Sequence, residues 1–201
     1  MTGPNVHTSE PCLVNQAAGG DREARRELFE RYREVAYRVA FRITGRHEDS
    51  MDVVQDGYIK AFESLSGFQG GSSFKTWLLR IVNNKALDLL RSRKVRLAAP
   101  LDAGDDSPQA DYIGPAPGDL PHDAMNRREL AERLHRAVDS LPPDQRSVFA
   151  LYATGDMTYG EIAEVVGVPL GTVMSRIYHA RRKLHDMLPD LAPREPQRSK
   201  T

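Results

Sequence analysis

One short stretch of the chain gathers groups that can hold an unpaired nucleic-acid strand. Between Gly71 and Arg96 there are seven Lys or Arg residues and one acid, Asp88, whereas the whole chain balances 28 basic against 28 acidic residues. The same stretch contains the only tryptophan, Trp77. Cations bind phosphates, aromatic rings stack on bases and amides contact base edges. The cationic and amide side chains that fit this chemistry are Lys75, Arg80, Asn83, Asn84, Lys85, Arg91, Arg93, Lys94 and Arg96.

The same pattern also describes an ordinary amphipathic helix with a solvated basic face. Trp77 shares an apolar stripe with Ile81, so it favours the helix core over a stacking platform. Features elsewhere in the chain therefore have to decide between the two interpretations.

A second candidate DNA-binding element lies near the C-terminus. Ala163, Gly167 and Val173 have the spacing of a helix-turn-helix, with a small residue at the helix crossing, a glycine in the turn and a branched anchor in the second helix. The face of the second helix opposite Val173 carries hydroxyl, imidazole, aromatic and guanidinium groups, which suit the edges and phosphates of a major groove. Its members are Ser175, Tyr178, His179 and Arg182, and it is flanked by Met174, Arg176 and Arg181. The pattern indicates a reader of duplex DNA, with a plain helical hairpin as the alternative.

Periodicity predicts an all-α fold in which helices position both elements. Apolar residues recur at helical spacing after Asp21, a plausible N-cap, until Thr44-Gly45 ends the helix. A second helix is expected from about residue 48 and a third from about residue 73. The C-terminal helices are expected near 127–140, 143–153 and 158–166, the last opened by a Thr158-x-x-Glu161 capping box, and from about 171 onward. We expect the second helix to bury Met51, Val54, Tyr58, Phe62 and Leu65.

Composition divides these helices into two small domains. Residues 97–126 contain six acids, five prolines and no Lys or Arg, so we interpret them as an acidic flexible linker. The predicted organisation is a disordered tail over 1–20, a helical domain over 21–96, the linker, a second helical domain over 127–188 and a disordered tail over 189–201.

The totals exclude several classes of protein. There is no apolar run of about 20 residues and no signal-peptide pattern, and the single Cys12 cannot form an internal disulfide, so we expect a cytoplasmic protein. No phosphate-binding glycine loop, nucleophile elbow or Cys/His metal set is present, which predicts a protein without enzymatic activity, cofactor or metal. The acids near His47 match no known ligand spacing.

Several motifs, in order, resemble the sigma-70 family of bacterial RNA polymerase sigma factors. The segments 52–62, 74–81 and 87–91 resemble region 2 of that family, and the segments 141–146, 161–163 and 171–176 resemble region 4. Their spacing is similar to that of the compact extracytoplasmic-function (ECF) group. The resemblance implies a subunit that binds core polymerase, recognises the −35 and −10 promoter elements and promotes DNA melting.

The resemblance also implies roles for individual residues. Core polymerase, through its β′ clamp helices and its β subunit, is expected to contact the motif residues Asp52, Val53, Gln55, Asp56, Tyr58 and Phe62. The basic stretch is expected to open the −10 element, with Asn84 contacting an unstacked base, and Thr172 is expected to join the −35-reading face. An anti-sigma factor is a further expected partner.

Two residues depart from the family pattern, and one other function stays open. Met174 lies where relatives often carry Lys or Arg, and Gly57 interrupts the docking helix at a cost of about 1 kcal/mol of helix propensity relative to alanine. The alternative is a helix-turn-helix regulator that binds duplex DNA without polymerase, which the docking motif argues against.

Overall fold

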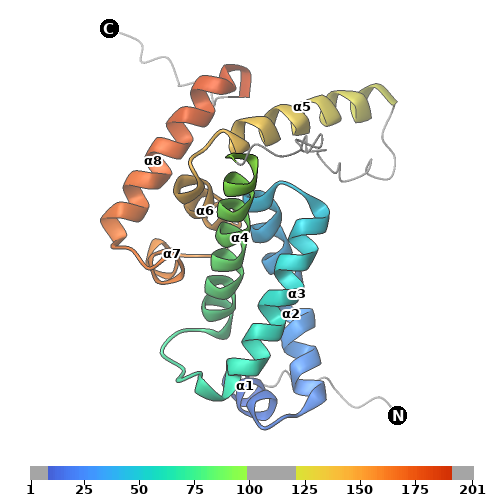
Figure 1. Cartoon of the computed structure of the whole chain (residues 1–201), viewed down its shortest axis with the longest axis vertical. Helices are drawn as coiled ribbons and strands as arrows, with labels where there is room; N and C mark the ends of the chain where they lie inside the picture. The colour runs from blue at the N-terminus through green and yellow to red at the C-terminus, as the bar shows by residue number, and fades with distance from the viewer. Residues whose placement is uncertain (1–8, 99–120, 192–201) are drawn as a thin grey trace, which may run out of the picture.

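The computed structural model of the chain describes residues 9–98 and 121–191, and these are organised in helices (Figure 1). The elements are α1 (Glu10–Ala18), α2 (Arg22–Thr44), α3 (His47–Ser64), η1 (Leu65–Gly67), α4 (Phe74–Ala98), α5 (Pro121–Asp139), α6 (Pro143–Tyr152), α7 (Tyr159–Val166), α8 (Leu170–Met187) and η2 (Pro189–Leu191). The expected all-α fold with two helical domains is confirmed.

The N-terminal domain is built on α2, α3 and α4, which pack against one another in pairs. Asp21 caps α2 by accepting a hydrogen bond from the Ala24 amide at 2.9 Å, and Gly45 ends the helix in the left-handed conformation at φ 75°. Both ends are those that the sequence predicts. Three aromatic rings meet beside the start of α4, where Trp77 lies 5.1 Å from Phe68 and 5.9 Å from Phe74 between ring centroids.

The expectation of a disordered tail over 1–20 is wrong for the residues that the structure describes. Helix α1 buries Leu13, Val14 and Ala17 against the N-terminal domain. The Glu10 carboxylate accepts the Phe74 amide at 2.9 Å at the start of α4, and it also accepts the Tyr32 hydroxyl. Burial and this carboxylate raise the pKa of Tyr32 to about 12. The tail becomes ordered because these apolar and polar contacts offset its loss of chain entropy. Residues 1–8 lie outside the described part of the chain.

The C-terminal domain contains α5 to α8, and its helix-turn-helix is confirmed. Thr158 and Glu161 form the expected capping box, and Gly167 turns the chain at φ 68° between α7 and α8. Two boundaries differ from the prediction. Helix α5 begins at Pro121 rather than near 127, because a proline is well suited to a first helical turn. The chain also continues past 188 into η2, which an Asp190–Arg133 ion pair at 2.7 Å ties to α5. Helix α4 extends to Ala98, two residues into the predicted linker, and the linker prediction over 99–120 and the tail prediction over 192–201 remain untested, because the structure does not describe those residues.

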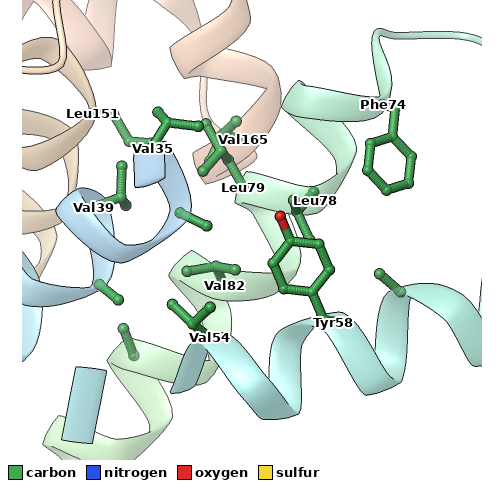
Figure 2. Close-up of a cluster of buried hydrophobic side chains, with 14 of the residues drawn as sticks. Val35, Val39, Val54, Tyr58, Phe74, Leu78, Leu79, Val82, Leu151 and Val165 are labelled. Carbon is green, nitrogen blue, oxygen red and sulfur yellow. The ribbon is translucent and has the colours of Figure 1, made fainter. Parts of the chain in front are cut away.

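The two domains share one hydrophobic core. Val35 of α2 and Leu79 of α4 join Leu151 of α6 and Val165 of α7 in a single buried cluster, and Figure 2 shows these side chains converging from the separate helices. Helices α4 and α7 lie side by side, as do α2 and α6. The C-terminal domain therefore covers one face of α4.

Among the helices of the described residues, none is both long and apolar enough to cross a lipid bilayer.

Candidate nucleic-acid interface

Helix α4 carries the predicted −10-binding residues, and it presents them on different faces. Arg80, Asn84, Lys94 and Arg96 are exposed to solvent. Asn83 is buried, with 1% of its surface exposed, and its side-chain oxygen accepts a hydrogen bond from Ser147 of α6 at 2.5 Å. One of the two adjacent amides is thus available to a ligand in this conformation, while the other is covered by the C-terminal domain.

The remaining cations of this set contact the protein itself. Lys75 donates to the main-chain oxygen of Asp156 at 2.7 Å, in the loop between α6 and α7. Lys85 lies 3.2 Å from the Asp56 carboxylate of α3, which joins a predicted −10 residue to a predicted docking residue. Such exposed pairs contribute little to stability, so a nucleic-acid ligand can replace them readily. Arg91 forms another exposed pair with Asp88. Arg93 differs, because it pairs with Asp49 in a largely buried contact in which the two side chains are 20% and 17% exposed.

Helix α3 divides the predicted polymerase-docking residues between its outer and inner faces. Asp52, Gln55 and Asp56 are exposed and form an acidic, amide-bearing surface. Val53 and Tyr58 are buried at 5% and 4% exposure, so in this conformation they support the helix from within. Burial raises the pKa of Tyr58 far above its ordinary value. Phe62 is half-buried and packs on the core.

Two apolar residues enlarge the outer face of α3. Met51 and Ile59 are each 50% exposed, although the sequence pattern predicts that Met51 is buried. The pattern fails because Met51 lies in the first turns of α3, at the edge of the apolar stripe. The outer face of this helix therefore combines apolar and acidic groups.

The structure explains Gly57, the residue in α3 that helix propensity disfavours. A Cβ atom at this position would lie 2.9 Å from Val82 Cγ2 of α4. Glycine thus lets α3 and α4, which carry the docking face and the basic face, approach closely.

Helix α8 exposes most of the predicted −35-reading face. Ser175, Tyr178, His179, Arg181 and Arg182 are exposed, and Thr172 is half-exposed. Arg176 instead lies at the inner margin, where it bonds the Asp144 carboxylate of α6 at 2.9 Å. This pair positions α8 on α6. The opposite face buries Val173, Ile177, Ala180 and Leu184, as the sequence predicts.

Arg146 of α6 connects the two domains by hydrogen bonds. Its buried guanidinium donates to the Ile43 carbonyl at the end of α2 at 3.1 Å and to the Asp139 carboxylate at 2.9 Å. Burial lowers the pKa of Arg146, and Asp139 opposes that shift. Close by, a Cβ on Gly45 would meet His135 of α5 at 2.9 Å. The domain contact is therefore closely fitted and hydrogen-bonded.

Sequence reasoning did not single out the cations of α2 that lie at this contact. Arg38 lies 3.6 Å from the Asp156 carboxylate, and Arg42 follows one turn later with a buried guanidinium nitrogen that has no hydrogen-bond partner. Burial, followed by repulsion from Arg38, lowers the pKa of Arg42. No sequence signal distinguishes these arginines from the others of a highly basic helix.

No group of three or more His, Cys, Asp or Glu side chains that could hold a metal ion occurs within 9–98 and 121–191.

Comparison with known proteins agrees with this arrangement. Residues 28–96 match the family model of sigma-70 region 2, and residues 131–184 match that of sigma-70 region 4. The chain is 37% identical over 163 residues to the ECF RNA polymerase sigma factor SigE of Mycolicibacterium smegmatis, a match that covers 81% of this chain and 60% of that protein. It is 33% identical over 190 residues to the ECF RNA polymerase sigma-E factor of Escherichia coli, covering 92% of this chain and 97% of that protein.

A solved structure is similar over most of the chain. CnrH, determined in complex with the cytosolic domain of CnrY, superposes with a TM-score of 0.68 at 26% identity, covering 91% of this chain and 99% of CnrH. The matched regions coincide with the domain that carries α4 and with the helix-turn-helix domain. The chain belongs to the sigma-70 family, as an RNA polymerase sigma factor of the ECF group.

Proposed function

We propose that this sigma factor melts promoters with the exposed face of α4 while α8 reads the −35 element. The single observation that carries the proposal is the exposure of Asn84 among cations on α4, in a helix whose buried face fixes its orientation. An amide held in this way can form paired hydrogen bonds with an adenine edge once the base has left the stack. The neighbouring cations Arg80, Lys94 and Arg96 supply sequence-independent attraction to phosphates.

The outer face of α3 is the proposed contact with core polymerase. Asp52, Gln55 and Asp56 would meet the basic β′ clamp helices, and Met51 and Ile59 would add apolar contact area. Val53 and Tyr58 would act indirectly, by holding α3 in place. This assignment keeps the docking face and the −10 face on separate helices, so that both can be used together.

The closed arrangement of the domains requires a rearrangement before promoter binding. The centres of the −35 and −10 elements lie about 25 nucleotides apart, or about 85 Å at 3.4 Å per step. Helices α4 and α7 pack side by side here, and packed helices lie only about 8–10 Å apart. The acidic segment 99–120, which joins α4 to α5, would serve as the tether that lets the domains separate and would occupy channels of polymerase that otherwise hold nucleic acid.

The closed form also suits a regulated protein of the cytoplasm. CnrH was solved in complex with another protein, the cytosolic domain of CnrY. We propose that this chain also binds a protein partner, namely an anti-sigma factor that covers its docking and DNA-binding faces. The exposed outer faces of α3 and α8 would be the surfaces that such a partner occupies.

Transcription in vitro tests the proposal. Purified chain and core polymerase should initiate at defined sites on genomic DNA of the source organism, as shown by mapping the 5′ ends of the transcripts. Asn84→Ala should leave core binding unchanged and reduce the yield of permanganate-reactive, melted promoter several-fold. Arg26→Ala, which removes an exposed cation of α2 to which no role is assigned, serves as the control. An unchanged melting yield for Asn84→Ala would show that this amide does not contact the open strand.

A further inference from the structure

The loop between α6 and α7 brings two oxygen atoms of one residue to cations of the N-terminal domain. The main-chain oxygen of Asp156 accepts Lys75 Nζ at 2.7 Å, and its carboxylate lies 3.6 Å from the Arg38 guanidinium. Lys75 belongs to α4 and Arg38 to α2, so Asp156 bridges two helices from a third segment. The carboxylate of Glu161 also acts on Lys75 electrostatically.

These cations border the face of α4 that the C-terminal domain covers. Lys75, Leu79 and Asn83 follow one another at four-residue spacing and share one side of the helix. Leu79 and Asn83 are buried, the former in the core shared with Val165 (Figure 2) and the latter against Ser147. Separation of the domains would expose this face of α4 to solvent. The exposed strip would then present the cation of Lys75, the apolar side chain of Leu79 and the amide of Asn83, with Arg38 of α2 beside it.

The cations of α2 are poorly neutralised in the closed form. Glu34 lies 2.9 Å from Arg38, but it is 79% exposed and screened by solvent. Arg42, one turn later, has a buried guanidinium nitrogen without a hydrogen-bond partner. Loss of the Asp156 contacts would therefore leave Lys75 without its acceptor and Arg38 next to an incompletely satisfied Arg42, a setting that attracts an anion.

We propose that Arg38 and Lys75 form a phosphate clamp for the unpaired promoter strand, and that Asp156 occupies the place of the phosphate while the domains are closed. The proposal rests on the function proposed above and extends it to residues of α2. A phosphodiester offers the same chemistry as Asp156, namely oxygen acceptors and a single negative charge, and both cations can contact it at once. The C-terminal domain would thus compete directly with DNA for the clamp.

Binding of the full chain to a labelled oligothymidylate tests the clamp without knowledge of the promoter sequence. Asp156→Ala should increase affinity about 3- to 10-fold, because it removes the competing carboxylate. Adding Arg38→Gln to that variant should abolish the gain and lower the salt slope, the dependence of log affinity on log salt concentration, by about 0.7, the value for one phosphate contact on a single strand. Arg33→Gln is the matched control, because Arg33 is 59% exposed on the same helix and pairs with Glu30.

Holoenzyme on fork-junction DNA with an unpaired non-template strand provides the second measurement. Arg38→Gln should again lower the salt slope by about 0.7, while Arg33→Gln leaves it unchanged. Equal behaviour of the two variants in both assays would overturn the clamp. Failure of the unmodified holoenzyme to bind the fork would instead contradict the proposed function, and the oligothymidylate series would still decide the clamp on its own. Circular dichroism checks that each variant is folded.

Discussion

Replacing Arg146 with methionine should lower the unfolding free energy of the C-terminal domain, so that this domain unfolds before the N-terminal domain. Methionine retains an apolar stem and removes the guanidinium, which donates to Ile43 across the domain contact and to Asp139 and Leu141 within the C-terminal domain. The substitution removes the guanidinium from the Asp139 carboxylate, which is 25% exposed and keeps His135 Nε2 at 3.1 Å, and it leaves the Ile43 carbonyl without this donor. Breaking a buried ion pair costs about 3–5 kcal/mol, and because Asp139 is partly exposed the expected loss of unfolding free energy is about 3 kcal/mol.

Urea unfolding followed with two probes measures this effect. Far-ultraviolet circular dichroism reports all helices, whereas the fluorescence of Trp77 reports the N-terminal domain. The unmodified chain should show coincident transitions, because its domains share one core. In Arg146→Met the dichroism transition should begin at lower urea than the fluorescence transition.

Two further variants test whether the loss comes from the hydrogen bonds and the ion pair of Arg146. Arg146→Lys keeps the charge but cannot reach all of the acceptors, so its loss should be intermediate. In the background Asp139→Asn, Arg146→Met should cost less than in the unmodified chain, because the charge pair is already gone. A loss below about 1 kcal/mol with coincident transitions would refute the reasoning.

Three further predictions concern local features. Gly57→Ala should destabilise the chain because the added methyl group clashes with Val82. In a Val82→Ala background the same substitution should stabilise the chain by up to about 1 kcal/mol, because alanine is the better helix former. Thermal unfolding measures both effects, and the same sign in both backgrounds would contradict the close-packing account. Hydrogen bonds from Thr158 lower the pKa of the Glu161 carboxyl, so the ionised carboxylate should stabilise α7 above the ordinary carboxyl pKa, and this stabilisation should be lost as the pH falls through the lowered value. Glu161→Gln should remove this part of the pH dependence of the unfolding free energy. An unaltered dependence in the variant would contradict the assignment. Met174 is 51% exposed on α8, so Met174→Arg should raise the salt slope of −35 duplex binding by about one phosphate contact, whereas equal slopes would show that position 174 does not face DNA.

The sequence predicts most of the helices and their ends because those signals are local. Asp21, Gly45 and the Thr158–Glu161 box act within a few residues of their own positions, and the structure contains each as expected. The family motifs likewise lie in continuous segments. Local chemistry therefore sufficed for the fold class and for the two helices that we propose to face DNA.

The sequence pattern does not predict contacts between residues that are far apart in the chain. Asn83 and Asn84 are chemically identical neighbours, and only the packing of α6 on α4 buries the first and leaves the second exposed. Helix α1 was missed because its nine residues begin beside a proline and a polar tail, while the contacts of Glu10 with Tyr32 and Phe74 span 22 and 64 residues. The proposed role of Arg38 depends on its contact with Asp156, which lies more than a hundred residues away in the sequence.

The docking residues predicted from the motif include both exposed and buried side chains, because a sequence motif does not show which of its residues are buried. A motif records which residues a helix needs, both those that contact a partner and those that hold the helix in place. Val53 and Tyr58 belong to the second kind, as their burial shows. Exposure on the folded helix, rather than membership of the motif, identifies the residues that face solvent.

The distance between the two domains tests the central claim most directly. Fluorescent labels at Ser92 of α4 and Glu164 of α7, both exposed, can be attached through introduced cysteines after Cys12→Ser. Energy transfer should be high in the free chain, where α4 and α7 are packed together, and should fall sharply in the holoenzyme on promoter DNA, where α4 and α8 have to reach elements about 85 Å apart. Transfer that stays high in a transcriptionally active promoter complex would contradict the account.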